Sequence, residues 1–406
     1  MTALLTDRWP GLASAPYSPM RARIARALFR HAVRDLPVRI LLPDGGQLGA
    51  GDVSAPTMSL VRPREFFHRL GKDAKIGFGE AYMAGDWTSA EPAELLTPFA
   101  RRLTTLVPPV LQNLRRLVDH RQPDTERNSV QGARENIHRH YDLSNELFAT
   151  FLDETMTYSA AWFASPEEEL AAAQRRKIDG VLDYAGVGEG STVLEIGTGW
   201  GALAIRAAAR GATVTSVTIS PEQASLARSR AQQAGVSDRV EVQLRDYRQA
   251  TGSYDAVVSV EMIEAVGIDY WQTFFSTVDR VLRPGGRMGL QAITMPHDRM
   301  LATRDSYTWI HKYIFPGGMC PSVRAIEDTL RQYTGMRITE CRSLGMDYAH
   351  TLRRWRHRFS ARWEEISTLG FDETFRRMWE FYLAYSEAGF RSGYLDDWQF
   401  SLRKPA

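Results

Sequence analysis

The residues best suited to chemistry lie in one short run, V-L-E-I-G-T-G-W-G, at positions 193–201. An apolar segment carries Glu195 near its end and is followed by glycines at positions 197, 199 and 201. Because glycine has no Cβ, the backbone of such a turn can approach a ligand closely. The helix expected over residues 202–210 begins with amides that face the same space, so the turn suits a ligand that carries a carboxylate.

The residues after the next expected strand argue against a dinucleotide as the ligand of this turn. A dinucleotide-binding turn has the spacing G-x-G-x-x-G and an acidic residue about 20 positions later. Neither is present, because the strand expected over residues 213–217 runs into Thr218, Ile219 and Ser220. The order Glu195-x-Gly197 instead resembles the first motif of S-adenosylmethionine-dependent methyltransferases.

Further segments have the order and spacing of one known family. They are H-Y-D-L at 140–143, Y-S at 158–159, T-I-S-P-E-Q at 218–223, R-D-Y-R at 245–248, K-Y-I-F-P-G-G at 312–318 and W-E-F-Y-L at 379–383. Over most of its length the chain thereby resembles the cyclopropane fatty acid synthases, which modify double bonds in the acyl chains of membrane lipids. The resemblance implies an α/β fold class: a Rossmann-like methyltransferase sheet with helices on both faces, plus a smaller N-terminal lipid-handling domain.

The elements that must position these motifs can be read from the pattern of the chain. Strands are expected at residues 192–196, 213–217, 240–244, 255–260 and 287–293. Their alternation with helix-length segments predicts a parallel sheet, whose ligands bind at the carboxyl ends of the strands. A chain of 406 residues exceeds the size of one core, and the polar stretch 121–131 carries turn formers. We therefore predict two domains, residues 1–125 and 126–406.

The family resemblance implies S-adenosylmethionine as the cofactor and assigns seven residues to it. Tyr158, Ser159, Gly197 and Gly199 would hold the methionine part, Thr218 and Gln223 the ribose, and Asp246 the adenine. Each polar residue also has a structural alternative. Thr218, Ser220 and Gln223 could cap a helix that starts near Pro221, and Asp246 could cap a turn.

The chemistry expected of this cofactor is methyl transfer to an alkene, which leaves a carbocation in a pocket that must exclude water. Aromatic faces stabilise a cation by about 0.5–2 kcal/mol each without reacting readily. The candidates are Tyr307, Trp309, Tyr313, Phe315, Trp379, Tyr382 and Phe390. The alternative is that these residues belong to a protein core, where aromatic residues at helical spacing are found more often than in catalytic roles.

The cation must then lose a proton, and the base site departs from the family pattern. In cyclopropane synthases the base is a bicarbonate held by a cysteine, a glutamate, a histidine and a tyrosine. Here the cysteine position is Ala160 and the histidine position is Gln291, whereas Glu264 and Tyr348 remain. The two missing ligands make a bound bicarbonate doubtful.

A protein carboxylate is therefore expected as the base, because burial in a dry pocket raises its pKa and makes it a better proton acceptor. The predicted catalytic residues are Glu146 as the first choice, Glu264 as the second, and Tyr348. The alternative is that Glu146 is an ordinary acid on a helix surface. No metal site is expected, since Cys320 and Cys341 lack the paired spacing of zinc ligands.

An altered base site favours an altered product. The chain resembles an actinobacterial branch of the family, in the tuberculostearic acid pathway, that converts the oleoyl chain of phospholipids into a 10-methylene product. Cyclopropane formation is the alternative reaction. A protein that binds lipid and cofactor with little turnover is the alternative from another class.

The N-terminal part of the chain points to a membrane surface. Residues 1–130 carry a net charge of +5 and the remainder −3. After Ser18 and Pro19, a predicted helix N-cap and first helical residue, one stripe contains Met20, Ile24, Ala27, Leu28 and His31 and another Arg23, Arg26, Arg30 and Arg34. Such a helix can bind anionic head groups, or it can be an arginine face beside an ordinary core stripe.

These features predict where the protein acts and with what partners. No apolar run reaches 18 residues, the N-terminus lacks the pattern of a signal peptide, and two cysteines cannot form a disulfide framework. We expect a cytoplasmic protein, peripheral to the inner face of the membrane, that binds the phospholipid surface and an acyl chain. A reductase acting on the methylene product and a second copy of the chain are further candidate partners, and no nucleic-acid partner is expected.

Overall fold

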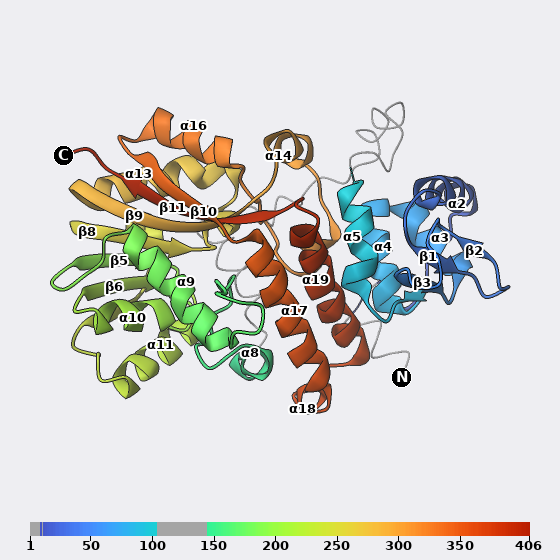
Figure 1. The fold of residues 1–406 in the computed structure, drawn as a ribbon, viewed down its shortest axis with the longest axis horizontal. Coiled ribbons are helices and arrows are strands. Elements are labelled where there is room, and N and C mark those ends of the chain that lie inside the picture. The colour runs from blue at the N-terminus through green and yellow to red at the C-terminus, as the bar shows by residue number, and fades with distance from the viewer. Residues whose placement is uncertain (1–8, 10, 104–143) are drawn as a thin grey trace. The chain divides into compact units, whose positions relative to one another are not determined.

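The computed structural model describes residue 9, residues 11–103 and residues 144–406 (Figure 1). The chain divides into two compact units. Unit 1 is drawn from Met1–Gln122, Asp305–Pro316 and Leu352–Tyr394, and unit 2 from Pro123–Arg304, Gly317–Thr351 and Leu395–Ala406. The predicted boundary between residues 125 and 126 lies outside the described residues and stays a prediction. The return of two later segments to unit 1 was not predicted.

A seven-stranded sheet forms the centre of unit 2 (Figure 1). Its strands are β5 (Thr192–Ile196), β6 (Thr213–Thr218), β7 (Val240–Leu244), β8 (Tyr254–Val260), β9 (Leu282–Thr294), β10 (Arg337–Ser343) and β11 (Asp396–Arg403), in the order β10-β11-β9-β8-β5-β6-β7. Strands β5 to β9 are parallel, whereas β11 and β10 are antiparallel additions at one edge. The five predicted strands and the fold class are confirmed.

Helices cover both faces of this sheet, as predicted (Figure 1). The helices in the described part of unit 2 are α8 (Asn145–Phe151), α9 (Leu170–Tyr184), α10 (Ala202–Ala209), α11 (Pro221–Gln233), α12 (Ile263–Val266), α13 (Trp271–Val281), α14 (His297–Thr303), α16 (Val323–Tyr333) and the first part of α17 (Gly345–Ala361), with short 3-10 turns at η2 (Tyr247–Gln249) and η3 (Ile268–Tyr270). Because successive strand residues point to opposite faces, Val193 packs with α9 and α10, whereas Leu194 packs with α13 and α16.

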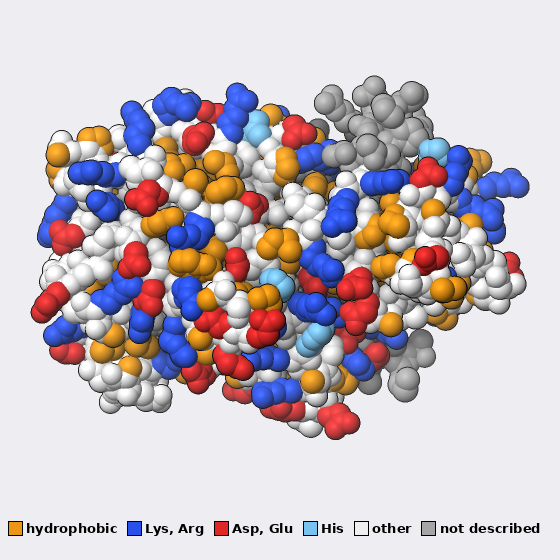
Figure 2. All heavy atoms as spheres, viewed as in Figure 1, with side chains coloured by type: hydrophobic (Ala, Val, Ile, Leu, Met, Phe, Trp, Pro, Cys, Tyr) orange, Lys and Arg blue, Asp and Glu red, His pale blue; other side chains and the backbone are white. Residues whose placement is uncertain are grey.

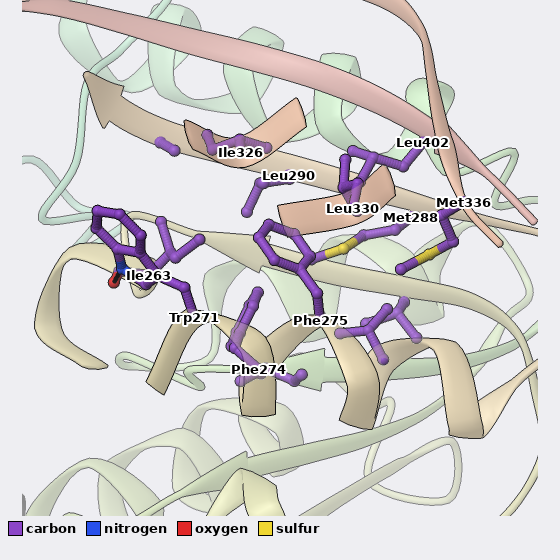
Figure 3. Close-up of a cluster of buried hydrophobic side chains, with 14 of the residues drawn as sticks. Ile263, Trp271, Phe274, Phe275, Met288, Leu290, Ile326, Leu330, Met336 and Leu402 are labelled. Carbon is purple, nitrogen blue, oxygen red and sulfur yellow. Dashed lines mark hydrogen bonds between the residues drawn. The ribbon is translucent and has the colours of Figure 1, made fainter. Parts of the chain in front are cut away.

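The core beneath α13 and α16 holds the loop that follows β8 (Figure 3). Buried residues of α13 recur at positions 271, 274, 275, 278 and 281, which places them on one face of the helix. Burial of such side chains stabilises the fold by about 1.5–3 kcal/mol each. Trp271 Nε1 also donates a hydrogen bond of 3.3 Å to Ile263 O, the first residue of α12. The core thereby fixes the short helix that carries Glu264.

Unit 1 combines a small sheet with helices from three parts of the chain. The sheet has the order β2-β1-β3-β4, from β1 (Arg39–Leu41), β2 (Gln47–Leu48), β3 (Thr57–Leu60) and β4 (Trp87–Thr88). The helices are α2 (Pro19–Val33), α3 (Pro63–Lys72), α4 (Ala74–Ala84), α5 (Pro92–Arg101), α15 (Trp309–Tyr313), α18 (Trp363–Thr368), α19 (Glu373–Arg391) and the second part of α17. No helix in the described part of the chain is long and apolar enough to cross a membrane.

The segment G-F-G-E-A-Y-M-A-G-D-W at residues 77–87 forms part of the core of unit 1. A Cβ on Gly77 would lie 2.2 Å from Arg69 O, and one on Gly79 would lie 2.5 Å from Trp309 Cδ1, so both glycines permit close packing. Asp86 is buried, and its carboxylate accepts a hydrogen bond of 2.9 Å from Arg69 Nε. This motif therefore has a structural role in the described unit.

Helix α2 buries a different stripe from the one expected of a core helix. Pro19 is its first residue, as predicted, but the Ser18 side chain makes no capping hydrogen bond. The buried residues are Ala22, Ala25, Phe29 and Val33, whereas Met20, Ile24, Ala27, Leu28 and His31 are all exposed. The interpretation of the latter stripe as core is therefore wrong. Basic side chains lie over the same part of the surface (Figure 2).

Candidate functional site

The glycine turn follows β5 at the carboxyl edge of the parallel strands. All three glycines have positive φ, +96° at Gly197, +50° at Gly199 and +88° at Gly201, a region that favours glycine. A Cβ on Gly201 would lie 3.0 Å from the Ala227 Cβ of α11, and one on Gly199 would meet no atom within 4 Å. The turn is thus packed tightly on its protein side and open at Gly199.

A buried polar triad supports the turn from beneath. Ser216 Oγ of β6 lies 2.5 Å from Glu195 Oε2 and 2.6 Å from Thr198 Oγ1. Burial raises the pKa of Glu195 to about 8, because the carboxylate loses its water and gains only the Ser216 hydroxyl as a partner. Glu195 therefore fixes the turn mainly as a neutral, hydrogen-bonded group.

The predicted ribose residues lie together at the end of β6. Thr218 Oγ1 donates a hydrogen bond of 2.9 Å to Gln223 Oε1. Ser220 is the N-cap of α11, since its Oγ accepts a hydrogen bond of 3.2 Å from Gln223 N. The capping alternative thus holds for Ser220, while the roles of Thr218 and Gln223 in binding stay predictions.

The predicted adenine residue follows β7. Asp246 is the N-cap of η2, and its carboxylate accepts a hydrogen bond of 2.6 Å from the Arg248 guanidinium. The turn-capping alternative is therefore present as well. The side chain is buried at the same edge of the sheet as the glycine turn, so a role in cofactor binding stays a prediction.

The segment with Tyr158 and Ser159 lies between the glycine turn and α9. Lys177 Nζ, from α9, donates a hydrogen bond of 2.5 Å to Ser159 Oγ. The Tyr158 ring packs edge-on against Phe148 of α8 with 5.1 Å between centroids, and Phe148 contacts Trp200 of the glycine turn. The predicted H-Y-D-L segment at 140–143 lies outside the described residues.

Helix α8 also places the first-choice base. Its N-terminal Asn145 accepts a hydrogen bond of 2.8 Å from Trp200 Nε1, so the helix lies beside the glycine turn. Glu146, the next residue, is exposed to solvent. In the part of the chain that the structure describes, Glu146 has the exposed position that the surface-acid alternative expects, and its role as a base stays a prediction.

A different carboxylate, that of Glu261, accepts hydrogen bonds from three of the positions that the family pattern assigns to bicarbonate. Glu261 follows β8 with φ +48°, and its Oε1 accepts hydrogen bonds of 2.8 Å from Ala160 N and 2.9 Å from Gln291 Nε2. Its Oε2 accepts one of 2.6 Å from Tyr348 Oη. The hydrogen bond from Ala161 N to Thr351 Oγ1 of α17, 3.0 Å long, holds the loop in place.

Two further carboxyl groups, those of Glu264 and Asp397, belong to the same buried cluster as Glu261. Ile293 N donates to Glu264 Oε1, while Glu264 Oε2 is buried without a hydrogen-bond partner in the described structure. Burial and the nearby Glu261 raise the pKa of Glu264 to about 8. Asp397 accepts a hydrogen bond of 2.8 Å from Gln291 Nε2, and burial together with both glutamates raises its pKa well above the ordinary value.

Lys177 supplies the positive charge of this cluster. Burial lowers the pKa of its ammonium group to about 8, although Glu261 and Asp397 oppose the shift. Burial also raises the pKa of Glu261, and Lys177 is the largest opposing influence. Burial and the carboxyl groups raise the pKa of the Cys320 thiol, which keeps it protonated. One ammonium group therefore faces three carboxyl groups, which favours a single anion among them.

Glu264 and Tyr348 of this cluster were predicted from the sequence, whereas Glu261, Lys177 and Asp397 were not. A signal for Glu261 was present, because it is an acidic residue directly after an apolar parallel strand, at the edge where ligands bind. Lys177 lies in a helix and Asp397 in a strand that was not predicted. Only the tertiary fold brings them to Glu261.

The aromatic candidates for stabilising a cation all belong to unit 1. Trp309 packs edge-on against Phe381 with centroids 4.7 Å apart, and Phe315 packs against Tyr382 at 5.7 Å. Trp379 is fully buried and lies 5.1 Å from the Tyr382 ring. In the described unit Trp309 and Trp379 belong to the core, in agreement with the structural alternative, whereas Phe315 is 37% exposed.

Comparisons with known proteins agree with this architecture. Residues 128–400 match the family model described as mycolic acid cyclopropane synthetase. The tuberculostearic acid methyltransferase UfaA1 of Mycobacterium tuberculosis is 54% identical over 410 residues, which cover 98% of this chain and 96% of that protein. A cyclopropane-fatty-acyl-phospholipid synthase of Escherichia coli is 34% identical over 359 residues, which cover 85% of this chain and 87% of that protein.

A solved structure extends the comparison to three dimensions. The mycolic acid cyclopropane synthase CmaA1, complexed with SAH and CTAB, has a TM-score of 0.62 and 31% identity and covers 70% of this chain and 99% of its own. The family match spans both the glycine turn and the Glu261 cluster. The chain therefore belongs to the mycolic acid cyclopropane synthetase family.

Proposed function

We propose that this protein transfers a methyl group from S-adenosylmethionine to the double bond of an oleoyl chain in a phospholipid and forms a 10-methylene product. One structural observation carries the proposal: the glycine turn lies beside the carboxyl cluster. A Cβ on Gly197 would lie 2.8 Å from Met262 Cγ, and Met262 directly follows Glu261. A bound methyl donor and a proton-accepting group would thus be neighbours.

The residues at this edge of the sheet fit S-adenosylmethionine. The open space at Gly199 admits a ligand, and the amides of the turn suit a carboxylate. Thr218 and Gln223 offer polar groups to the ribose, and Asp246 offers a carboxylate to the adenine. When bound, the cofactor supplies an electrophilic methyl group on a sulfonium sulfur.

Methylation of the uncharged alkene produces a carbocation, which must then lose a proton to give the product. The π electrons of the alkene form the new C–C bond at C10 as the S–CH3 bond of the methyl donor breaks, which releases S-adenosylhomocysteine and leaves the positive charge on C9. A hydride shift from C10 to C9 moves the charge to C10, and loss of a proton from the added methyl group gives the exocyclic C=C bond. This chain's part is to exclude water from the cation and to accept that proton.

The choice of product rests on the base site and on one relative. Ala160 and Gln291 replace two side chains that the family pattern assigns to bicarbonate, and the relative with 54% identity is named a tuberculostearic acid methyltransferase. If the proton left before the hydride shift, the same cation would close to a cyclopropane. The similarity to the relative named cyclopropane-fatty-acyl-phospholipid synthase supports cyclopropane formation as the alternative reaction.

The membrane surface is the proposed source of the substrate, and α2 the proposed contact. Met20 and Ile24 are 77% and 55% exposed, and Arg23, Arg26 and Arg30 are exposed on the same helix. Apolar side chains on a basic helix suit the boundary between acyl chains and anionic head groups, which are enriched on the inner leaflet. This supports a cytoplasmic protein peripheral to that leaflet.

A mass-spectrometric assay tests the reaction. Protein is incubated with oleoyl phospholipid vesicles and methyl-deuterated S-adenosylmethionine, and fragmentation locates the added carbon. Two deuterium atoms on an exocyclic methylene at C10 are expected. Two deuterium atoms in a ring would identify cyclopropane formation instead. Absence of methyl transfer despite cofactor binding would refute both reactions and favour a lipid- and cofactor-binding role.

The methylene product would be the substrate of a further enzyme. Conversion of the exocyclic C=C bond to a methyl branch needs two electrons and two protons, so a reductase that acts on unsaturated acyl chains is the proposed next enzyme. A homo-oligomer is the other proposed assembly, to be tested by light scattering.

A further inference from the structure

The three groups bonded to Glu261 come from positions at which the family pattern places ligands of bicarbonate. The family pattern places ligands at the positions of Ala160, Gln291, Glu264 and Tyr348. In this structure Ala160 N, Gln291 Nε2 and Tyr348 Oη all donate to the carboxylate of Glu261, at 2.6–2.9 Å. A carboxylate has the same planar O–C–O group as bicarbonate, so it can use the same donors.

The site consequently does not fit a separate bicarbonate ion. The donors that would hold the ion are already bonded to a side chain of the protein. A second anion would also lie beside the charged carboxylate of Glu261, where like charges repel each other. We propose that the Glu261 carboxylate occupies the place of bicarbonate in this protein and accepts the proton lost by the reacting acyl chain.

This inference rests on the proposed function and completes its last step. The C–H bond of the added methyl group breaks, its electron pair forms the C=C bond, and the proton moves to a Glu261 oxygen. The positive charge of the acyl chain and the negative charge of Glu261 are thereby cancelled together. No oxidant, reductant or external base is required.

Hydrogen bonding decides which of the three carboxyl groups is the base. Glu261 accepts three hydrogen bonds, whereas Glu264 and Asp397 accept one each, and their second oxygens, Glu264 Oε2 and Asp397 Oδ1, accept none in the described structure. Donors stabilise the charged form of a carboxyl group, so the anion that balances Lys177 is Glu261. Glu264 and Asp397 then remain neutral neighbours.

The first test removes the base and keeps its shape. In E261Q we expect turnover on oleoyl vesicles to fall by about 100-fold or more, since general bases contribute about 10²–10⁴-fold. Binding of S-adenosylhomocysteine, measured by calorimetry, should stay within about threefold of the parent. The matched control is E327Q, because Glu327 is exposed on α16. Parent turnover in E261Q would overturn the inference.

The second test reopens the site for an external anion. Glycine suits the φ of +48° at position 261, so E261G should keep the turn and free the three donors. We expect bicarbonate or formate to raise the turnover of E261G about tenfold or more, in a saturable way, without affecting the parent. Labelled bicarbonate should bind E261G and not the parent, as seen by carbon-13 NMR.

The outcomes separate this inference from the proposed function. Bicarbonate-dependent turnover of the parent, or bicarbonate binding to the parent at this site, would overturn the inference and leave methyl transfer intact. A parent protein that transfers no methyl group would refute the proposed function, whereas selective bicarbonate binding to E261G would still support the substitution of the ion by Glu261.

Discussion

Tyr348 and Glu261 are joined by a hydrogen bond of 2.6 Å although 87 positions separate them in the chain. The phenol Oη donates to Glu261 Oε2 and is one of three donors on that carboxylate. A hydrogen bond to a charged group contributes about 1.5–3 kcal/mol. Tyr348 is thus a positioning residue for Glu261, and its removal should change how Glu261 titrates.

Substitution of Tyr348 by phenylalanine should raise the pKa of Glu261, because the anion loses a donor. The acid limb of the pH–rate profile should move to higher pH by about one unit. Turnover near neutral pH should fall more than turnover on the alkaline plateau. Y333F, at an exposed tyrosine of α16, is the control. An unshifted profile in Y348F would contradict this link.

The glycine turn predicts a steric effect on cofactor binding. In G197A the new Cβ would lie 2.8 Å from Met262 Cγ at a φ of +96°. We expect affinity for S-adenosylhomocysteine, measured by calorimetry, to fall about tenfold or more, since left-handed backbone alone costs about 1–2 kcal/mol. The control G190A has a φ of +77° in open space, so it should lower stability without changing this affinity.

Burial of the Glu195 carboxyl group should make the stability of the folded protein depend on pH. Its pKa is raised to about 8 in the folded protein, so its stabilising contribution is complete below pH 4.5 and is lost as pH rises through 8. E195Q stays neutral throughout. The melting temperature of E195Q relative to the parent should therefore increase by about 5 °C between pH 5 and pH 9. A difference that is constant with pH would show that Glu195 is not protonated when folded.

Helix α2 predicts salt-dependent binding to anionic vesicles. The double variant R23Q/R30Q should bind phosphatidylglycerol vesicles about 10–30-fold more weakly at low salt, from about 1 kcal/mol per charge. I24S should weaken binding at both low and high salt, because Ile24 is 55% exposed and would insert among acyl chains. R239Q, at an exposed arginine of unit 2, is the control in a sedimentation assay. Equal binding by all variants would exclude α2 as the contact.

Local patterns predicted the parallel sheet well and its antiparallel edge poorly. Strands β5 to β8 are short, rich in β-branched residues and bounded by turn formers, and each lies near the next in the chain. β10 pairs with β11 across more than 50 residues, and most of its side chains are exposed. Neither its pairing nor its burial leaves a local signal.

The candidate site also has one part that the local sequence predicts and another part that only the tertiary fold brings together. The glycine turn is a local motif and was found, whereas Glu261 acquires its meaning from donors at positions 160, 291 and 348. Glu146 was favoured because a motif surrounded it, yet α8 leaves it exposed. In α2, small alanines and Phe29 are buried while larger apolar residues face solvent, so hydrophobicity alone selected the wrong stripe.

The interleaving of the two units has a consequence for synthesis on the ribosome. Helix α19 packs against α4 and α5. The core of unit 1 therefore stays incomplete until residue 391 has emerged from the ribosome. In unit 2, β11 lies between β9 and β10, so β10 has no partner strand until residue 403 has emerged. Neither unit can close cotranslationally in order from the N-terminus. Nascent chains of this protein should therefore expose apolar surface until late in translation and depend on chaperones that bind at the ribosome.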